Sequence, residues 1–181
     1  MPDRRHLWRG IHDPEMVKSG VTVELDLPTR SPGADLVATL VITSVRVGHL
    51  FPTYVTPRVV ARLALVDDGD RVVPGSVEER FIGREVTLDL TRELSDTRLP
   101  PGGRLEIAYR RPVDDTARLR LRATVTVYPD HFYTGFFEAL LNTWDKGFDL
   151  RSVWADMGPK SRAYCHAWNE FTGIETPGWM R

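Results

Sequence analysis

Residues 118–127 read Arg-Leu-Arg-Leu-Arg-Ala-Thr-Val-Thr-Val, and this stretch decides the fold class. Leucine, alanine and valine take every second position, and arginine or threonine fills the positions between them. Because successive side chains of a strand point to opposite faces of a sheet, the alternation predicts one buried face and one solvated face. Such a strand is typical of an antiparallel sheet that covers a core on one side.

The preceding part of the chain carries further runs of the same kind. Longer strands are expected at residues 21–27, 36–47 and 58–66, and shorter ones at residues 77–82, 86–90 and 104–109. Strands do not alternate with long helices, which argues against a parallel α/β sheet. About seven strands with short polar turns therefore predict a mainly β protein, an immunoglobulin-like antiparallel β-sandwich.

Helices are expected on both sides of the strands. Asp13, Pro14 and Glu15 are typical of a helix start, with a capping carboxylate and proline at the first helical position, and Gly20 ends that short helix. After Pro129 the apolar residues recur at helical spacing, namely at Tyr133, Phe136, Phe137, Leu140, Leu141 and Trp144. A C-terminal helical appendage is therefore predicted.

The chain is accordingly divided into three parts. Residues 1–20 form an entry segment with a short helix, residues 21–129 form the β-sandwich, and residues 130–181 form a helical tail. In the tail, further helices are expected over residues 149–158 and 161–171. The tail is expected to pack on the sandwich or on a partner.

Composition excludes several classes of function. The formal net charge of −1 gives no electrostatic reason to expect a nucleic acid or an anionic membrane as partner. No apolar run is long enough to span a membrane, and the given chain does not open on the apolar region of a signal peptide. One cysteine excludes a disulfide framework and any multi-cysteine metal site.

Four motifs occur in a recognisable order. They are His-Leu-Trp-Arg-Gly-Ile-His-Asp-Pro at residues 6–14, Gly-His-Leu-Phe-Pro-Thr at 48–53, Asp-Thr-Arg-Leu-Pro-Pro-Gly at 96–102 and Val-Tyr-Pro-Asp-His-Phe-Tyr at 127–133. Together they resemble the haem-free C-terminal β-sandwich and helical region of bacterial multihaem c-type cytochromes. The resemblance implies a periplasmic or extracellular protein of an electron-transfer system.

The same resemblance implies a non-catalytic module or subunit. It would dock on a c-type cytochrome or another redox subunit, shield haem, and donate a histidine as axial ligand. Because the chain has no Cys-x-x-Cys-His motif, no covalently bound haem is expected. Any haem c in contact with it would belong to a partner or to a missing upstream segment.

Three histidines are candidates for a haem ligand or haem contact. His6 and His12 lie in the entry segment, where the family places a distal ligand; the alternative is that both are surface or capping residues. His49 lies between a strand and Pro52, where a histidine is expected to fix a loop through backbone carbonyls. The functional alternative for His49 is contact with a cofactor or partner, on a rim shared with Thr53 and Tyr54.

Cys165 and His166 supply only the second half of a haem-attachment motif. Attachment of haem through a single thioether is one interpretation of this pair, and a core cysteine beside an exposed histidine is the other. Asp96 and Arg98 are expected to lock a turn, because aspartate favours such turns through bonds to nearby backbone.

Two other functions remain open from the sequence. The first is a stand-alone ligand-binding module that uses the loops at one end of the sandwich. The second is an enzyme with a metal held by His6, His12 or His49. Catalysis is not expected, because the chain has no nucleophile elbow, no glycine-rich phosphate loop and no His-Glu-x-x-His motif.

Overall fold

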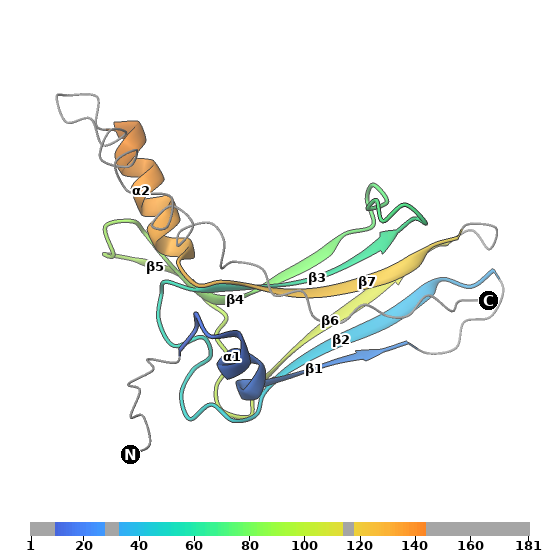
Figure 1. Cartoon of the computed structure of the whole chain (residues 1–181), viewed down its shortest axis with the longest axis horizontal. Coiled ribbons are helices and arrows are strands. Elements are labelled where there is room, and N and C mark those ends of the chain that lie inside the picture. The colour runs from blue at the N-terminus through green and yellow to red at the C-terminus, as the bar shows by residue number, and fades with distance from the viewer. Residues whose placement is uncertain (1–9, 28–32, 114–117, 144–181) are drawn as a thin grey trace, which may run out of the picture.

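The computed structural model describes residues 10–27, 33–113 and 118–143 as a β-sandwich with a helix on each side of it in sequence (Figure 1). Its elements, in chain order, are α1 (Pro14–Gly20), β1 (Val21–Asp26), β2 (Leu36–Ser44), β3 (Arg58–Val66), β4 (Glu78–Val86), β5 (Glu93–Asp96), β6 (Arg104–Arg111), β7 (Arg120–Tyr128) and α2 (His131–Thr143). The predicted mainly β fold, with a short N-terminal helix and a C-terminal helix, is confirmed.

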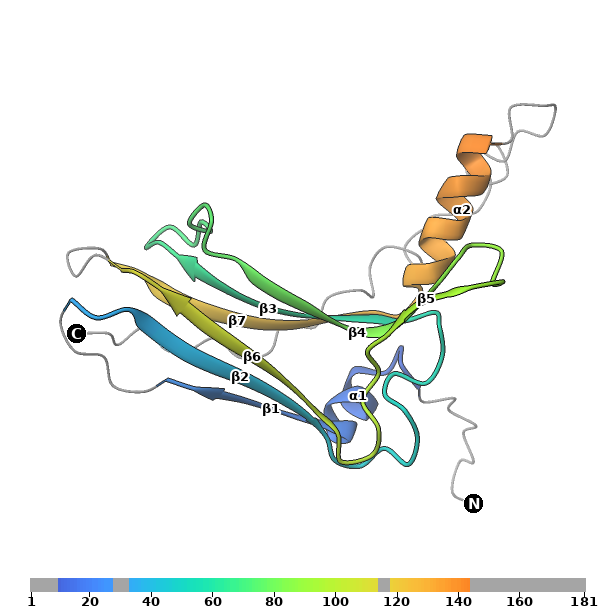
Figure 2. The same ribbon diagram turned by 180° about the vertical axis from the view of Figure 1, so that it is seen from behind.

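The strands form two antiparallel sheets. One has the order β1-β2-β6 and the other the order β5-β4-β3-β7. In the second sheet β3 lies between β4 and β7, and Ala61 is paired with both Arg80 and Val125. The two sheets face each other across the core, as both views of the ribbon show (Figures 1 and 2).

The core is built by the alternation seen in the sequence. In β7, Leu121, Ala123 and Val127 are buried, whereas Arg120 and Thr124 on the other face remain partly exposed. Other large buried side chains come from both sheets and include Leu40, Ile42, Val59, Leu63, Ile82, Ile107 and Tyr109. Burial of this apolar surface is the main term that stabilises the sandwich.

A buried polar contact fixes the loop between β3 and β4. The Tyr109 hydroxyl donates to the carbonyl oxygen of Ser76 at 2.7 Å, and the Ser76 hydroxyl donates to the carbonyl oxygen of Val73 at 2.7 Å. The Leu65 amide in turn donates to the Ser76 hydroxyl at 3.1 Å. These bonds satisfy polar groups that would otherwise be costly to bury.

The short strand predicted at residues 77–82 is confirmed as the first part of a longer strand, whereas the strand predicted at residues 86–90 is wrong. Residues 78–86 form one strand, β4, and the following residues form the turn to β5. Leu88 and Leu90 mimic an alternating strand, but Asp89 Oδ1 accepts bonds from the Thr87 and Thr91 hydroxyls and so holds a turn. Strand β5 was not predicted, because it is a polar edge strand with no buried side chain.

Both helices lie at the same end of the sandwich (Figures 1 and 2). Asp13 caps α1 as predicted, because its Oδ1 accepts the Met16 amide at 3.0 Å. Helix α2 leaves the end of β7 and projects away from the sheets (Figure 1). The tail helices expected over residues 149–158 and 161–171 lie outside the described residues, and the division into three parts stays a prediction.

Candidate functional site

The two motif turns lie side by side at the helical end of the sandwich. Phe51 and Leu99 form an isolated antiparallel bridge, in which each amide donates to the other's carbonyl oxygen at 2.8 Å. Both side chains are buried. The sequence motif at residues 48–53 is therefore joined to the motif at residues 96–102 by backbone and by packing.

Arg98 strengthens this junction. Its guanidinium donates to the Thr53 carbonyl oxygen at 2.9 Å and to the Asp96 carboxylate at 2.8 and 2.6 Å. The side-chain hydrogen bond from Arg98 lowers the pKa of Asp96, and the reciprocal bond raises the pKa of Arg98. The predicted turn-locking role of Asp96 and Arg98 is confirmed, and Arg98 also holds the neighbouring turn.

His49 is fixed within its own loop. Its Nδ1 lies 2.9 Å from the Leu50 carbonyl oxygen. A carbonyl oxygen can only accept, so Nδ1 carries the proton and Nε2 carries the lone pair. The Thr53 hydroxyl lies beside the ring, 3.1 Å from Nδ1 and 3.5 Å from Nε2. The expected bond from His49 to a backbone carbonyl is confirmed.

His12 forms a long-range contact. Its Nε2 lies 2.9 Å from Oδ2 of Asp130, 118 residues away in the sequence. This pair joins the segment before α1 to the residue before α2. The cap of α1 is Asp13 and not His12, and His12 is an exposed residue that is held by this pair.

A cavity brings His12 and His49 together. It has a volume of about 640 Å³ and lies between the start of the described chain and the loop from β2 to β3. Arg46 also lines it, and no aspartate or glutamate occurs in the part of its lining that the structure describes. The rest of the lining is mostly apolar and includes Ile11, Met16, Val17, Val47, Phe51, Pro52 and Tyr54. Its size and lining are those of a ligand-binding or docking site.

The other residues that the sequence offered as haem contacts or a haem-attachment site are His6, Cys165 and His166. All three lie outside the described residues. Within the described ranges, no group of three or more histidine, cysteine, aspartate or glutamate side chains could hold a metal ion. An imidazole that ligates a metal usually donates its other ring N–H to a carbonyl or carboxylate. His49, through Nδ1, and His12, through Nε2, each make such a contact, which leaves the other ring nitrogen of each as the atom that could bind a metal.

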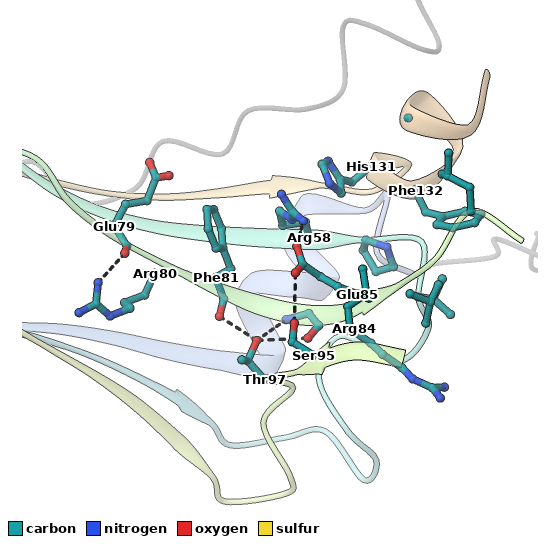
Figure 3. A pocket seen from close by; sticks show the side chains of 17 residues that line it. Arg58, Glu79, Arg80, Phe81, Arg84, Glu85, Ser95, Thr97, His131 and Phe132 are labelled. Carbon is teal, nitrogen blue, oxygen red and sulfur yellow. Dashed lines mark hydrogen bonds and ion pairs between the residues drawn. The ribbon is translucent and has the colours of Figure 1, made fainter. Parts of the chain in front are cut away.

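A second cavity contains a histidine that sequence reasoning missed. It has a volume of about 570 Å³ and lies between β4, β5 and the start of α2, as Figure 3 shows. His131 lines it beside Arg58 and Phe132. Partial burial, followed by the positive charge of Arg58, lowers the pKa of His131 below its usual 6.5. The sequence placed His131 directly after Asp130, at the start of a predicted helix. No sequence pattern around it predicted a cavity.

Two charged residues of this second cavity, Arg58 and Glu85, are paired with each other. Arg58 is bonded to Glu85 and lies over the Phe81 ring, with its guanidinium carbon 4.9 Å from the ring centroid. Glu85 also accepts the Ser95 hydroxyl at 3.2 Å (Figure 3). These contacts tie β3, β4 and β5 together, so the arginine and glutamate serve the fold.

No helix in the described part of the chain is long and apolar enough to cross a membrane. No protein-family model matches the chain, and no curated protein sequence matches it.

The fold is similar to part of a solved structure, a penta-heme cytochrome c552 from Thermochromatium tepidum. The TM-score is 0.56 and the sequence identity 15%, over 76% of this chain. The match covers 38% of the cytochrome chain, so this chain corresponds to well under half of that protein. At this identity the likeness shows a shared fold.

Proposed function

We propose that this chain is a non-catalytic β-sandwich module of a multihaem c-type cytochrome system. It docks with the end that carries His12 and His49 against a c-type haem, shields that haem from water and offers it a histidine. The haem belongs to a partner chain or to a segment upstream of this one. The proposal places the protein in the periplasm or outside the cell.

One observation carries this proposal: His12 and His49, from separate segments, line the same largely apolar cavity. Haem is a flat apolar ring with an iron that imidazole binds strongly, so a largely apolar cavity lined by histidines suits it. The fold shared with part of a penta-heme cytochrome supports the same partner class. That support is limited to architecture, because the identity is 15%.

The test is to purify the full chain from its native host under mild conditions and to examine what remains bound. We expect a haem absorbance band from a co-purifying c-type cytochrome, and an intact mass for this chain without a haem increment. A haem-sized increment on this chain would instead favour attachment through Cys165 and His166. Absence of haem together with absence of any retained cytochrome would contradict the proposal.

A second candidate function is the binding of a small ligand by a free-standing module. The second cavity favours it, because Phe81, Phe132 and His131 line a space of about 570 Å³ that is not needed for docking at the other site. A screen of small aromatic acids and sugars by thermal unfolding tests this function. A midpoint that rises with ligand concentration and is lost in Phe81→Ala would favour it.

A further inference from the structure

We propose that the cavity between α1 and the loop from β2 to β3 binds a small carboxylic acid with an aromatic body. The ring of this ligand lies against the apolar wall of the cavity, and its carboxylate pairs with Arg46. Binding is non-covalent, so no bond is broken and no proton or electron is transferred. The site goes beyond the proposed function, and its test does not depend on docking to a cytochrome.

The loop that forms one wall of the cavity is held at both of its ends. The Gly20 carbonyl oxygen, at the end of α1, accepts the amides of Val45 and Arg46 at 2.9 and 3.3 Å. Further along the loop, the Thr56 carbonyl oxygen accepts the Phe132 amide at 3.0 Å. A wall that is already fixed needs little reorganisation on binding, which favours affinity for a small molecule.

Two further contacts hold the side of the cavity that is formed by α1 and the residues before it. His12 is bonded to Asp130 at 2.9 Å, which fixes the segment that precedes α1. Gly20 lies against Val47, where an added Cβ would come within 2.9 Å of the valine side chain. A larger residue at Gly20 would therefore push α1 away from the loop and change the shape of the cavity.

The apolar wall suits an aromatic ring. Phe51 and Tyr54 supply two aromatic side chains, and Pro52 and Pro57 supply saturated rings. Phe51 and Pro52 are buried, whereas Tyr54 is 72% exposed and can close over a bound molecule. Aromatic rings pack against such side chains in stacked or edge-on contacts. The volume of about 640 Å³ is within the range of small-molecule sites.

The charge of the cavity favours an anion. In the part of its lining that the structure describes, Arg46 is the one arginine, and lysine, aspartate and glutamate are absent. Among residues 10–27, 33–113 and 118–143, no aspartate or glutamate forms an ion pair with Arg46. By contrast, Arg58 and Arg84 of the second cavity are paired with Glu85 and Glu93. Because arginine binds a carboxylate through planar, bidentate hydrogen bonds, a carboxylate complements this cavity better than the second one.

The test compares two ligands of the same ring and similar size, 2-naphthoate and its neutral amide, by calorimetric titration of the purified full chain. We expect saturable binding of both, because both bury the ring, with the carboxylate bound about two- to five-fold more tightly. In Arg46→Gln this preference should disappear while the affinity for the amide stays unchanged. Retained affinity for the amide also shows that the variant keeps the cavity.

Matched variants separate the two cavities. Arg84→Gln removes the same charge from the second cavity and should keep the preference for the carboxylate. Tyr54→Ala should weaken both ligands about three- to ten-fold, whereas Phe81→Ala should weaken neither. In an NMR titration of the wild-type chain, amide shifts should occur at Gly48 and Tyr54 and be absent at Phe81 and Ser95.

Three results would overturn the proposal. If 2-naphthoate does not bind saturably, the site is wrong. If acid and amide bind equally well, the role of Arg46 is wrong. If binding is lost in Phe81→Ala, or the preference for the carboxylate is lost in Arg84→Gln, the ligand occupies the second cavity instead.

The proposed docking on a cytochrome fails in a different way. A chain that binds the acid but retains no cytochrome on native purification keeps this site and loses the proposed function. A chain that retains a cytochrome but does not bind 2-naphthoate keeps the proposed function and loses this site.

Discussion

The Arg98 guanidinium lies 2.9 Å from the carbonyl oxygen of Thr53, 45 residues earlier in the chain. This bond makes two sequence motifs into one structural unit at the end of the sandwich. Without it, the bridge between Phe51 and Leu99 would be the remaining backbone link between the two motifs.

Replacement of Arg98 by lysine should therefore destabilise the protein. Lysine keeps the charge but cannot bond to Thr53 and to both Asp96 oxygens from one planar group. Arg98 is only 11% exposed, so its partners lose bonds that water does not fully replace. We expect the free energy of unfolding in urea to fall by about 1–3 kcal/mol. In Arg110→Lys, where the side chain is 71% exposed, the loss should stay below about 0.5 kcal/mol; equal losses would contradict the argument.

Acid should weaken the same unit. The bond from Arg98 lowers the pKa of Asp96 below its ordinary value of 3.8 in the folded state. The ionised carboxylate therefore stabilises the fold above pH 3.8, and this contribution is lost as pH falls through the lower folded pKa. Wild type should be more stable than Asp96→Asn at pH 6, and the difference should shrink towards pH 2. A difference that stays constant across urea titrations at both pH values would count against this pairing.

His131 should make stability depend on pH in a higher range. Its folded pKa is lowered, first by burial and then by Arg58, so folding favours the neutral ring. Its contribution is complete above pH 6.5 and declines as pH falls below that value through the folded pKa. An NMR titration of the His131 ring should give a midpoint below 6.5. Arg58→Gln should raise the midpoint only in part, because burial is the larger cause; a midpoint at or above 6.5 in wild type would refute the assignment.

Leu90 is expected to be a site where substitution stabilises the protein. Its φ angle is +59°, in the left-handed region that leucine rarely adopts, and its side chain is 62% exposed. Asparagine tolerates this conformation, so Leu90→Asn should raise the free energy of unfolding by about 0.5–1 kcal/mol. Leu88→Asn, in the same turn but with an ordinary φ, should give no such gain in thermal unfolding. A loss of stability in Leu90→Asn would show that the leucine side chain is needed there.

Most of the strands could be predicted from the alternation of apolar and polar residues along the sequence. Residues 58–66 and 118–127 alternate because each forms a strand with one face on the core, and a period of two is visible without knowledge of the partner strand. The same rule failed at Leu88 and Leu90, where alternation arises in a turn held by Asp89. It also missed Glu93–Asp96, since an edge strand that buries nothing leaves no apolar period.

The site was predictable where its contacts are local. His49 bonds to the next residue, and Asp96 to a residue two positions away, so both roles follow from short-range chemistry. The contact between His12 and Asp130, by contrast, spans 118 residues and depends on how the two helices come to one end of the sandwich. The cavity that His12 lines, like the one beside His131, is a product of tertiary packing that a linear pattern does not encode.

The pairing of His12 with Asp130 also has a consequence for the order of folding. Contacts between distant residues form late, because the entropy of closing a long loop must first be offset by the strands between them. We therefore expect the wall of the cavity to be completed only after both sheets have assembled. A haem-bearing partner would then meet a finished sandwich and not a folding intermediate, and recognition would itself select for chains that have folded.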